Sequence, residues 1–159
     1  MQRFAALLDR LVLTPQRNGK LRLLAGHLRE TPDPDRGWAL AALTGGLDLP
    51  SLKPALLREM VARRIDPVLF ELSYDYVGDL AETIALVWGE PPERPARDLA
   101  LGSVVESLRA TSKARAPQIL AGYLDEMDPS ARWATLKLAT GGLRVGVSAR
   151  LAKQALADF

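Results

Sequence analysis

Apolar residues recur along this chain at the spacing of a helix face. The first such stripe, with members at i, i+3, i+4 and i+7, consists of Phe4, Leu7, Leu8 and Leu11. No segment alternates apolar and polar residues between hairpin turns, so the pattern predicts an all-α chain without a sheet. The apolar stripes of the expected helices fall at 4–11, 21–28, 38–43, 56–61, 68–72, 80–88, 101–108, 119–124, around 133 and at 151–156.

Turn-forming and capping residues separate these stripes. Thr14-Pro15 breaks the chain between the first two helices, and Gly45-Gly46 ends the third because glycine readily adopts the left-handed cap conformation. Asp33-Pro34-Asp35 is expected to cap the third helix and Ser51 the fourth. The proline-rich stretch 90–95 is expected to join two parts of one domain rather than to divide two domains.

The chain repeats itself at an offset of 96 residues. Leu24-Ala25-Gly26-His27-Leu28 matches the five residues from Leu120, and Thr44-Gly45-Gly46-Leu47 matches the four from Thr140. Trp38 and Trp133 lie at nearly the same offset and are expected in the core. Two short segments that recur at the same offset indicate a duplicated unit. We therefore expect a single globular helical domain over 1–159, with pseudo-symmetric halves at about 1–65 and 99–159 and a middle at about 66–98.

The net charge of +2 conceals an uneven distribution. Residues 1–29 carry a balance of +5 and residues 131–159 a balance of +4, whereas residues 66–98 carry −6. A polyanion would be attracted to both halves and repelled by the middle, as in a nucleic-acid-binding domain. Incidental clustering on solvated helix surfaces is the alternative interpretation.

Residues that could catalyse a reaction are scarce. The chain has no cysteine, which excludes disulfides, thiolate metal sites and cysteine nucleophiles. Its single histidine, His27, matches Tyr123 in the repeat and is expected to be a half-buried filler. Four acids are spaced like a solvated helix face rather than a metal site: Glu71, Asp75, Asp79 and Glu82. No Walker loop or catalytic triad occurs, and the amphipathic N-terminus predicts neither a signal core nor a membrane span.

The two Thr-Gly-Gly turns are the best candidates for binding chemistry. Glycine lets a backbone approach a phosphate closely, and a helix N-terminus after such a turn offers N–H groups and a positive dipole end. The second turn leads into a helix with Arg150 and Lys153 in its opening turns, and the first leads to Lys53. An ordinary helix C-cap followed by an N-cap is the alternative. Two such turns beside basic segments favour phosphate binding.

Two stretches resemble one known family. Residues 131–148, from Ala131-Arg132-Trp133 through the second Thr-Gly-Gly turn to Ser148, are similar to the end of the N-terminal DNA-binding domain of ATP-dependent DNA ligases, and residues 69–83 are similar to its middle, especially in bacterial members. The resemblance covers nearly the whole chain. It implies an all-helical domain that binds duplex DNA around a nick without sequence preference, through minor-groove and phosphate contacts. Such binding would support nick sealing in DNA repair, recombination or replication.

The resemblance and the matched turns together select a set of expected DNA-binding residues. They comprise the two glycine turns, the start of the last helix, and two polar turns that occupy similar places in the two halves. The set is Thr14, Arg17, Thr44, Gly45, Gly46, Leu47, Thr111, Ser112, Lys113, Thr140, Gly141, Gly142, Leu143, Arg144, Gly146, Val147, Ser148 and Arg150. Because Asp48 stands where the second copy has Arg144, we expect the second turn to contribute more.

The family's Lys-x-Asp-Gly motif, which carries the adenylated lysine, does not occur in this chain. The resemblance therefore implies that the catalytic adenylation and OB domains lie outside it, and that this fragment is non-catalytic and holds no metal or other cofactor. ATP and Mg²⁺ would serve the full-length ligase. The expected partners are nicked duplex DNA and the catalytic core of the same polypeptide. We expect a monomer in the cytoplasm, associated with the nucleoid and not with a membrane.

Two functions of other classes stay open at this point. A helical sequence-specific regulator would read bases in the major groove with a recognition helix. A helical protein-interaction scaffold would use an apolar groove and would not bind DNA.

Overall fold

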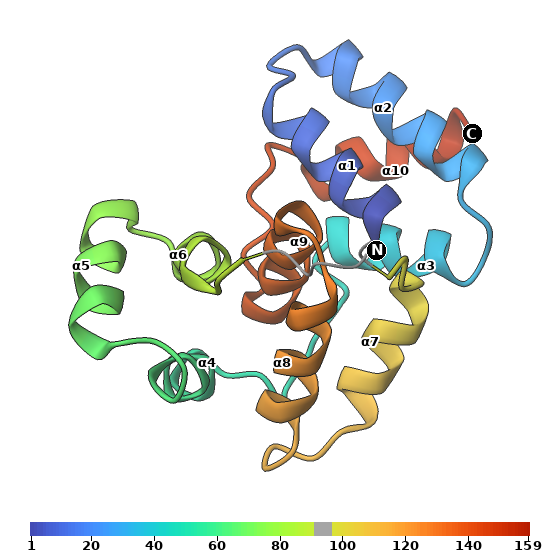
Figure 1. Ribbon diagram of the computed structural model, residues 1–159. Helices are drawn as coiled ribbons and strands as arrows, with labels where there is room; N and C mark the ends of the chain where they lie inside the picture. The colour runs from blue at the N-terminus through green and yellow to red at the C-terminus, as the bar shows by residue number, and fades with distance from the viewer. Residues whose placement is uncertain (91–96) are drawn as a thin grey trace.

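The computed structural model describes residues 1–90 and 97–159, and within them the chain forms ten helices and no strand (Figure 1). The prediction of an all-α domain is thus confirmed. The predicted joint at 90–95 lies, apart from Glu90, outside the described residues. None of the helices found in the described parts is long and apolar enough to cross a membrane. The helices are α1 (Gln2–Val12), α2 (Arg17–Glu30), α3 (Asp35–Leu43), α4 (Pro54–Ala62), α5 (Pro67–Val77), α6 (Leu80–Val87), α7 (Leu101–Ala110), α8 (Ala116–Glu126), α9 (Pro129–Thr140) and α10 (Ala149–Ala157).

Helices of each half pack against helices of the other half. α1 to α4 form the first copy and α7 to α10 the second, with α5 and α6 between them. α1 packs on α9 while its counterpart α7 packs on α3, and α2 packs on α10 while α8 packs on α4. Each of these contacts has its mate when the copies are interchanged, which is the arrangement that a pseudo-two-fold axis produces. The duplicated sequence therefore folds into two interlocked, pseudo-symmetric halves.

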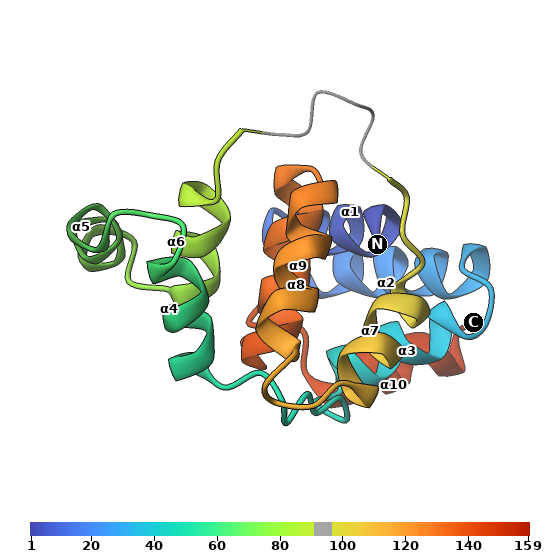
Figure 2. The same ribbon diagram turned by 60° about the horizontal axis from the view of Figure 1, so that its bottom comes forward.

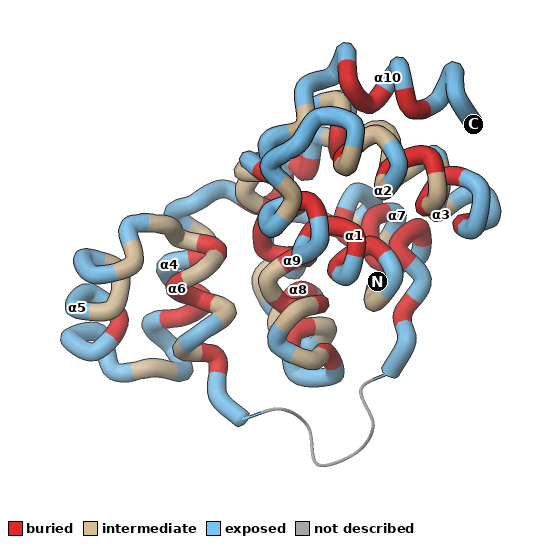
Figure 3. Tube along the Cα trace, turned by 90° about the horizontal axis from the view of Figure 1, so that it is seen from above, coloured by how far each residue is buried: buried red, intermediate tan, exposed pale blue. Residues whose placement is uncertain are grey.

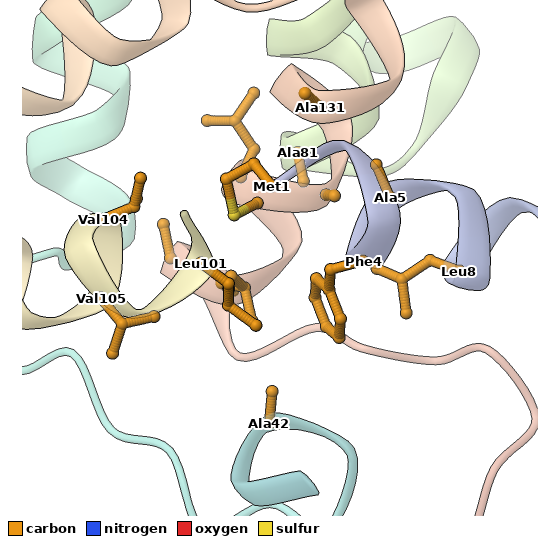
Figure 4. Packing of buried hydrophobic residues seen from close by; sticks show 14 of the residues in the cluster. Met1, Phe4, Ala5, Leu8, Ala42, Ala81, Leu101, Val104, Val105 and Ala131 are labelled. Atoms are coloured by element: carbon orange, nitrogen blue, oxygen red, sulfur yellow. The ribbon is translucent and has the colours of Figure 1, made fainter. Parts of the chain in front are cut away.

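The main core lies where helices of both halves meet. Figure 4 shows Phe4 and Leu8 of α1 facing Leu101 and Val105 of α7, with Ala42 of α3 below them. Burying one leucine or phenylalanine side chain in this way contributes about 1.5–3 kcal/mol. Buried positions concentrate along these helices, whereas α5 is exposed along most of its length (Figure 3).

The two repeated tryptophans sit at the edge of this core rather than inside it. Trp38 and Trp133 are only half-buried. Each packs one side against the core, and each has a cation over its ring, Arg109 over Trp38 and Lys137 over Trp133. The expectation that both are simply core residues is therefore only partly correct.

Two predicted helix caps were wrong, because their side chains bond across the molecule instead. The Asp35 carboxylate accepts hydrogen bonds from the backbone N–H groups of Leu101 and Gly102, at 2.9 and 2.8 Å, and so caps α7 of the other half. Ser51 Oγ donates to the carbonyl oxygen of Thr111 at 2.7 Å, while α4 begins after Lys53 without a side-chain cap. Both side chains join the two halves.

Lys137 of α9 is a buried lysine that forms ion pairs between α9 and the start of α6. Its side chain is 7 % exposed, and its Nζ lies 2.8 Å from Asp79 and 3.2 Å from Glu82. Asp79 also caps α6 by accepting from the N–H of Glu82. Partial burial by itself raises the pKa of Asp79, but the hydrogen bonds from Lys137 and the backbone outweigh it and lower the pKa below its ordinary 3.8.

The acidic cluster predicted as a solvated face is therefore divided. Asp79 and Glu82 hold Lys137, whereas Glu71 and Asp75 on α5 are exposed as expected. No group of acids and histidines in the described ranges is arranged to hold a metal ion.

His27 packs as a filler beside Phe4, but it is buried, not half-buried as its match to Tyr123 predicted. Its ring lies 6.4 Å from that of Phe4, centroid to centroid, and a ring nitrogen lies 3.4 Å from Thr31 Oγ1. Burial is the main cause that lowers the pKa of His27 below its ordinary 6.5.

We expect the free energy of unfolding to decrease as the pH falls from 7 to 5. The unfolded chain binds a proton on His27 as the pH passes 6.5, but the folded chain does so only at lower pH, so acid favours unfolding. His27→Gln should flatten this part of the profile. Urea titrations of both proteins across this range measure the effect, and equal pH slopes would contradict it.

Candidate nucleic-acid interface

The fold gathers the predicted site residues at two loop pairs. In the first pair, the α1–α2 loop (13–16) and the α9–α10 loop (141–148) line one hollow through Pro15 and Gly146, and Lys20 of α2 donates from Nζ to the carbonyl oxygen of Val145 at 2.6 Å. In the second pair, the α3–α4 loop (44–53) meets the α7–α8 loop (111–115) through Ser51 and Thr111. Figure 2 shows the α3–α4 and α7–α8 loops side by side along the lower edge of the molecule.

The pseudo-symmetry explains this pairing, since the two loops of each pair come from different halves. The first pair includes or adjoins Thr14, Arg17, Thr140, Gly141, Gly142, Leu143, Arg144, Gly146, Val147, Ser148 and Arg150. The second includes Thr44, Gly45, Gly46, Leu47, Thr111, Ser112 and Lys113. In the first pair, residues that are about 130 positions apart in the sequence thus share one surface.

The first loop pair encloses a basic hollow. Arg17, Lys20 and Arg150 line it together with Gly146 and Ser148. Among the described residues, neither Arg17 nor Arg150 forms an ion pair, and no carboxylate lines the hollow. Such a concentration of positive charge suits an anion.

The hollow also lies at the start of α10. Ser148 caps this helix by accepting from the N–H of Leu151 at 3.1 Å. The N–H groups of Ala149 and Arg150, in the first turn, have no partner within the helix, and the positive end of the helix dipole lies there. Two backbone donors and the arginine side chains could therefore bind one phosphate group.

The Thr-Gly-Gly turns themselves are helix C-caps. Gly45 and Gly141 adopt left-handed φ values of 76° and 65°. Gly46 N–H donates to the Ala41 carbonyl at 2.8 Å, and Gly142 N–H donates to the Lys137 carbonyl at 3.1 Å, the pattern of a Schellman cap. The hydroxyls of Thr44 and Thr140 likewise donate to carbonyls of their own helices. These glycine N–H groups are occupied, so the turns set the direction of the loops and do not themselves offer free donors.

Lys20 holds the second of these loops in place, and sequence reasoning missed that role. It is 8 % exposed, and its bond to Val145 fixes the loop against α2. Gly146 follows with φ 67°, and a Cβ there would collide with Lys20 Nζ. The available sequence signal was that Lys20 lies in a basic segment beside Arg17, but its partner Val145 is 125 residues away.

The second loop pair is less basic at the equivalent places. Asp48 is exposed in it, and α4 begins with Pro54, which has no N–H to offer. Lys53, Lys113 and Arg115 are exposed there and supply its positive charge.

Comparison with known proteins agrees with this geometry. The family model described as DNA ligase N terminus matches residues 1–157. A search of curated proteins found no match. The helical pseudo-two-fold domain with its basic loop pair therefore belongs to the family of N-terminal domains of ATP-dependent DNA ligases.

Proposed function

We propose that this domain binds duplex DNA around a nick without sequence preference, through phosphate and minor-groove contacts made by both loop pairs. The observation that carries the proposal is the basic hollow of the first loop pair, which joins Arg17 of one half to Arg150 of the other at the start of α10. A duplex has two antiparallel backbones related by two-fold symmetry, so two pseudo-symmetric loop pairs fit one backbone each. Membership of a ligase family supports DNA as the polyanion.

In this proposal the two loop pairs contribute unequally to the free energy of DNA binding. The first has two arginines free of ion pairs and the free N–H groups of α10, whereas the second has Asp48 and the proline at the start of α4. The first pair therefore provides most of the binding free energy, and the second orients the duplex. Phosphate contacts of this kind carry no base information, which accounts for binding without sequence preference.

Within the parent ligase, the domain acts as a monomer that holds the nicked DNA for the catalytic core of the same polypeptide. Adenylate transfer from ATP, with Mg²⁺, is assigned to the adenylation and OB domains, and the 159-residue chain contributes no catalytic group. Its place is the cytoplasm, with the nucleoid, where the ligase seals nicks during repair, recombination or replication.

Electrophoretic mobility shifts with random-sequence nicked duplex test this function. We expect binding whose log affinity falls with log salt at a slope of about −3, because Arg17, Arg144 and Arg150 each neutralise about one phosphate at about −0.9 per contact. Sequence dependence would favour a regulator, and no binding would favour a protein scaffold. A slope near zero would remove the phosphate contacts from the proposal.

A further inference from the structure

A second basic hollow lies outside both loop pairs, in the groove between α1 and α2. Arg3 and Arg10 of α1 line it opposite Arg22 of α2. A neighbouring hollow shares Arg10 and Arg22 and extends the groove to Thr14 in the α1–α2 loop. The groove thus runs from the middle of the α1–α2 hairpin to the first loop pair.

The arginines of this groove are little neutralised. Arg10 and Arg22 are exposed, and the guanidinium group of neither forms an ion pair with any described residue. Arg3 donates to the backbone carbonyl of Glu30 at 2.9 Å, and Glu30 is the one carboxylate lining the groove. Three arginines face one acid there, so the groove attracts anions.

The groove occurs in one half only. At the offset of 96, the residues that correspond to Arg3, Arg10 and Arg22 are Leu99, Glu106 and Gln118. The α7–α8 hairpin therefore carries no equivalent row of arginines. The groove therefore departs from the pseudo-symmetry that relates the two loop pairs.

We propose that this groove binds the sugar–phosphate backbone of the duplex beyond the nick, on the side of the first loop pair alone. The inference rests on the proposed function, because the first loop pair must seat the DNA. Arg3 and Arg10 are seven residues apart on α1, about 10 Å, which matches about three phosphate steps of 3.4 Å along the axis of one strand. The domain would then cover a longer stretch of DNA on one side of the nick than on the other.

Continuity favours DNA over an acidic protein segment. Thr14 lies at the end of the groove, and Pro15 and Arg17 line the first basic hollow, so the groove and the hollow adjoin at the α1–α2 loop. An acidic helix would need apolar anchor points. Leu7, which lines the groove, is buried against the core, whereas Leu13 at its loop end is 82 % exposed, so it is the charge of the groove and its continuity with the first basic hollow that favour DNA.

The double variant Arg10→Ala/Arg22→Ala tests the inference on centrally nicked duplexes. We compare arms of about eight base pairs with duplexes in which either arm is lengthened to about twenty. Wild type should bind more tightly when one particular arm is lengthened, with a salt slope steeper by about two contacts. The variant should lose that gain, about tenfold, and should bind the short duplex like wild type.

The matched control is Arg58→Ala/Arg63→Ala, which removes two exposed arginines, one within α4 and one at its C-cap, and should keep the gain. Circular dichroism verifies that each variant is helical. If the double variant keeps the full gain, or if wild type shows none, the inference is overturned while the proposed function stands. If only binding of a polyglutamate peptide is lost, the groove belongs to an acidic protein. Failure of wild type to bind any duplex would instead remove the proposed function.

Discussion

Gly146→Val is expected to weaken binding to nicked duplex DNA about 100-fold while the domain stays helical. A β-branched residue at φ 67° is strained, and its Cβ would displace Lys20 Nζ from the Val145 carbonyl. The α9–α10 loop would then leave its place against α2. Loss of about two charge-assisted hydrogen bonds to phosphate, at about 1.5 kcal/mol each, gives this effect. Fluorescence anisotropy with labelled duplex measures it.

Gly122→Ala is the matched control for this experiment. Gly122 lies inside α8, where an added Cβ meets nothing within 4 Å. The control should bind DNA like wild type and be more stable by about 0.5–1 kcal/mol, since alanine is the better helix former. A folded Gly146→Val protein with wild-type affinity would exclude the α9–α10 loop from the interface.

Asp79→Ala is expected to lower the free energy of unfolding by about 2–3 kcal/mol. The change removes the cap of α6 and leaves the buried Lys137 with Glu82 alone. The effect falls below that of a fully buried pair because solvent reaches the Asp79 carboxylate. For a domain of this size the melting temperature should fall by about 4–12 °C. Calorimetry at neutral pH measures it, well above the pH where Asp79 becomes protonated and its contribution disappears.

Asp128→Ala separates the cap from the ion pair. Asp128 caps α9 by accepting from the N–H of Ala131 at 2.8 Å, and no ion pair involves it among the described residues. Its loss should cost about 1 kcal/mol. Adding Lys137→Met to Asp79→Ala should restore part of the lost stability, because the unpaired buried charge is gone. Equal losses for Asp79→Ala and Asp128→Ala would show that Lys137 contributes nothing.

The sequence predicted the all-helical fold well because helices depend on local signals. The spacing of apolar residues indicates one helix face at a time. The matched segments at 24–28 and 120–124 indicate which positions of the two copies correspond. The Thr-Gly-Gly segments likewise predicted where α3 and α9 end. The Thr-Gly-Gly segments could not show which glycine is left-handed or that the Gly46 and Gly142 N–H groups are hydrogen-bonded, since both features depend on the geometry of the final turn of each helix.

Features that depend on distant partners could not be predicted. Asp35 has the sequence of a local cap, yet its acceptor oxygens are used 66 and 67 residues later. Lys20 is one of six bases in its segment, and only packing of α2 beside the α9–α10 loop distinguishes it. Arg3 and Arg10 do share a helix face by their spacing of seven, but the groove exists only because Arg22 lies opposite on α2.

The packing of helices between the halves also determines the order of events during synthesis. Helical domains usually fold fast because most of their contacts are local. Here Lys20 bonds to a residue 125 positions later, and Arg29 bonds to Asp158, 129 positions later. A nascent chain therefore holds α1 and α2 without their partners until α9 and α10 leave the ribosome, and both halves complete their folding together only at that point.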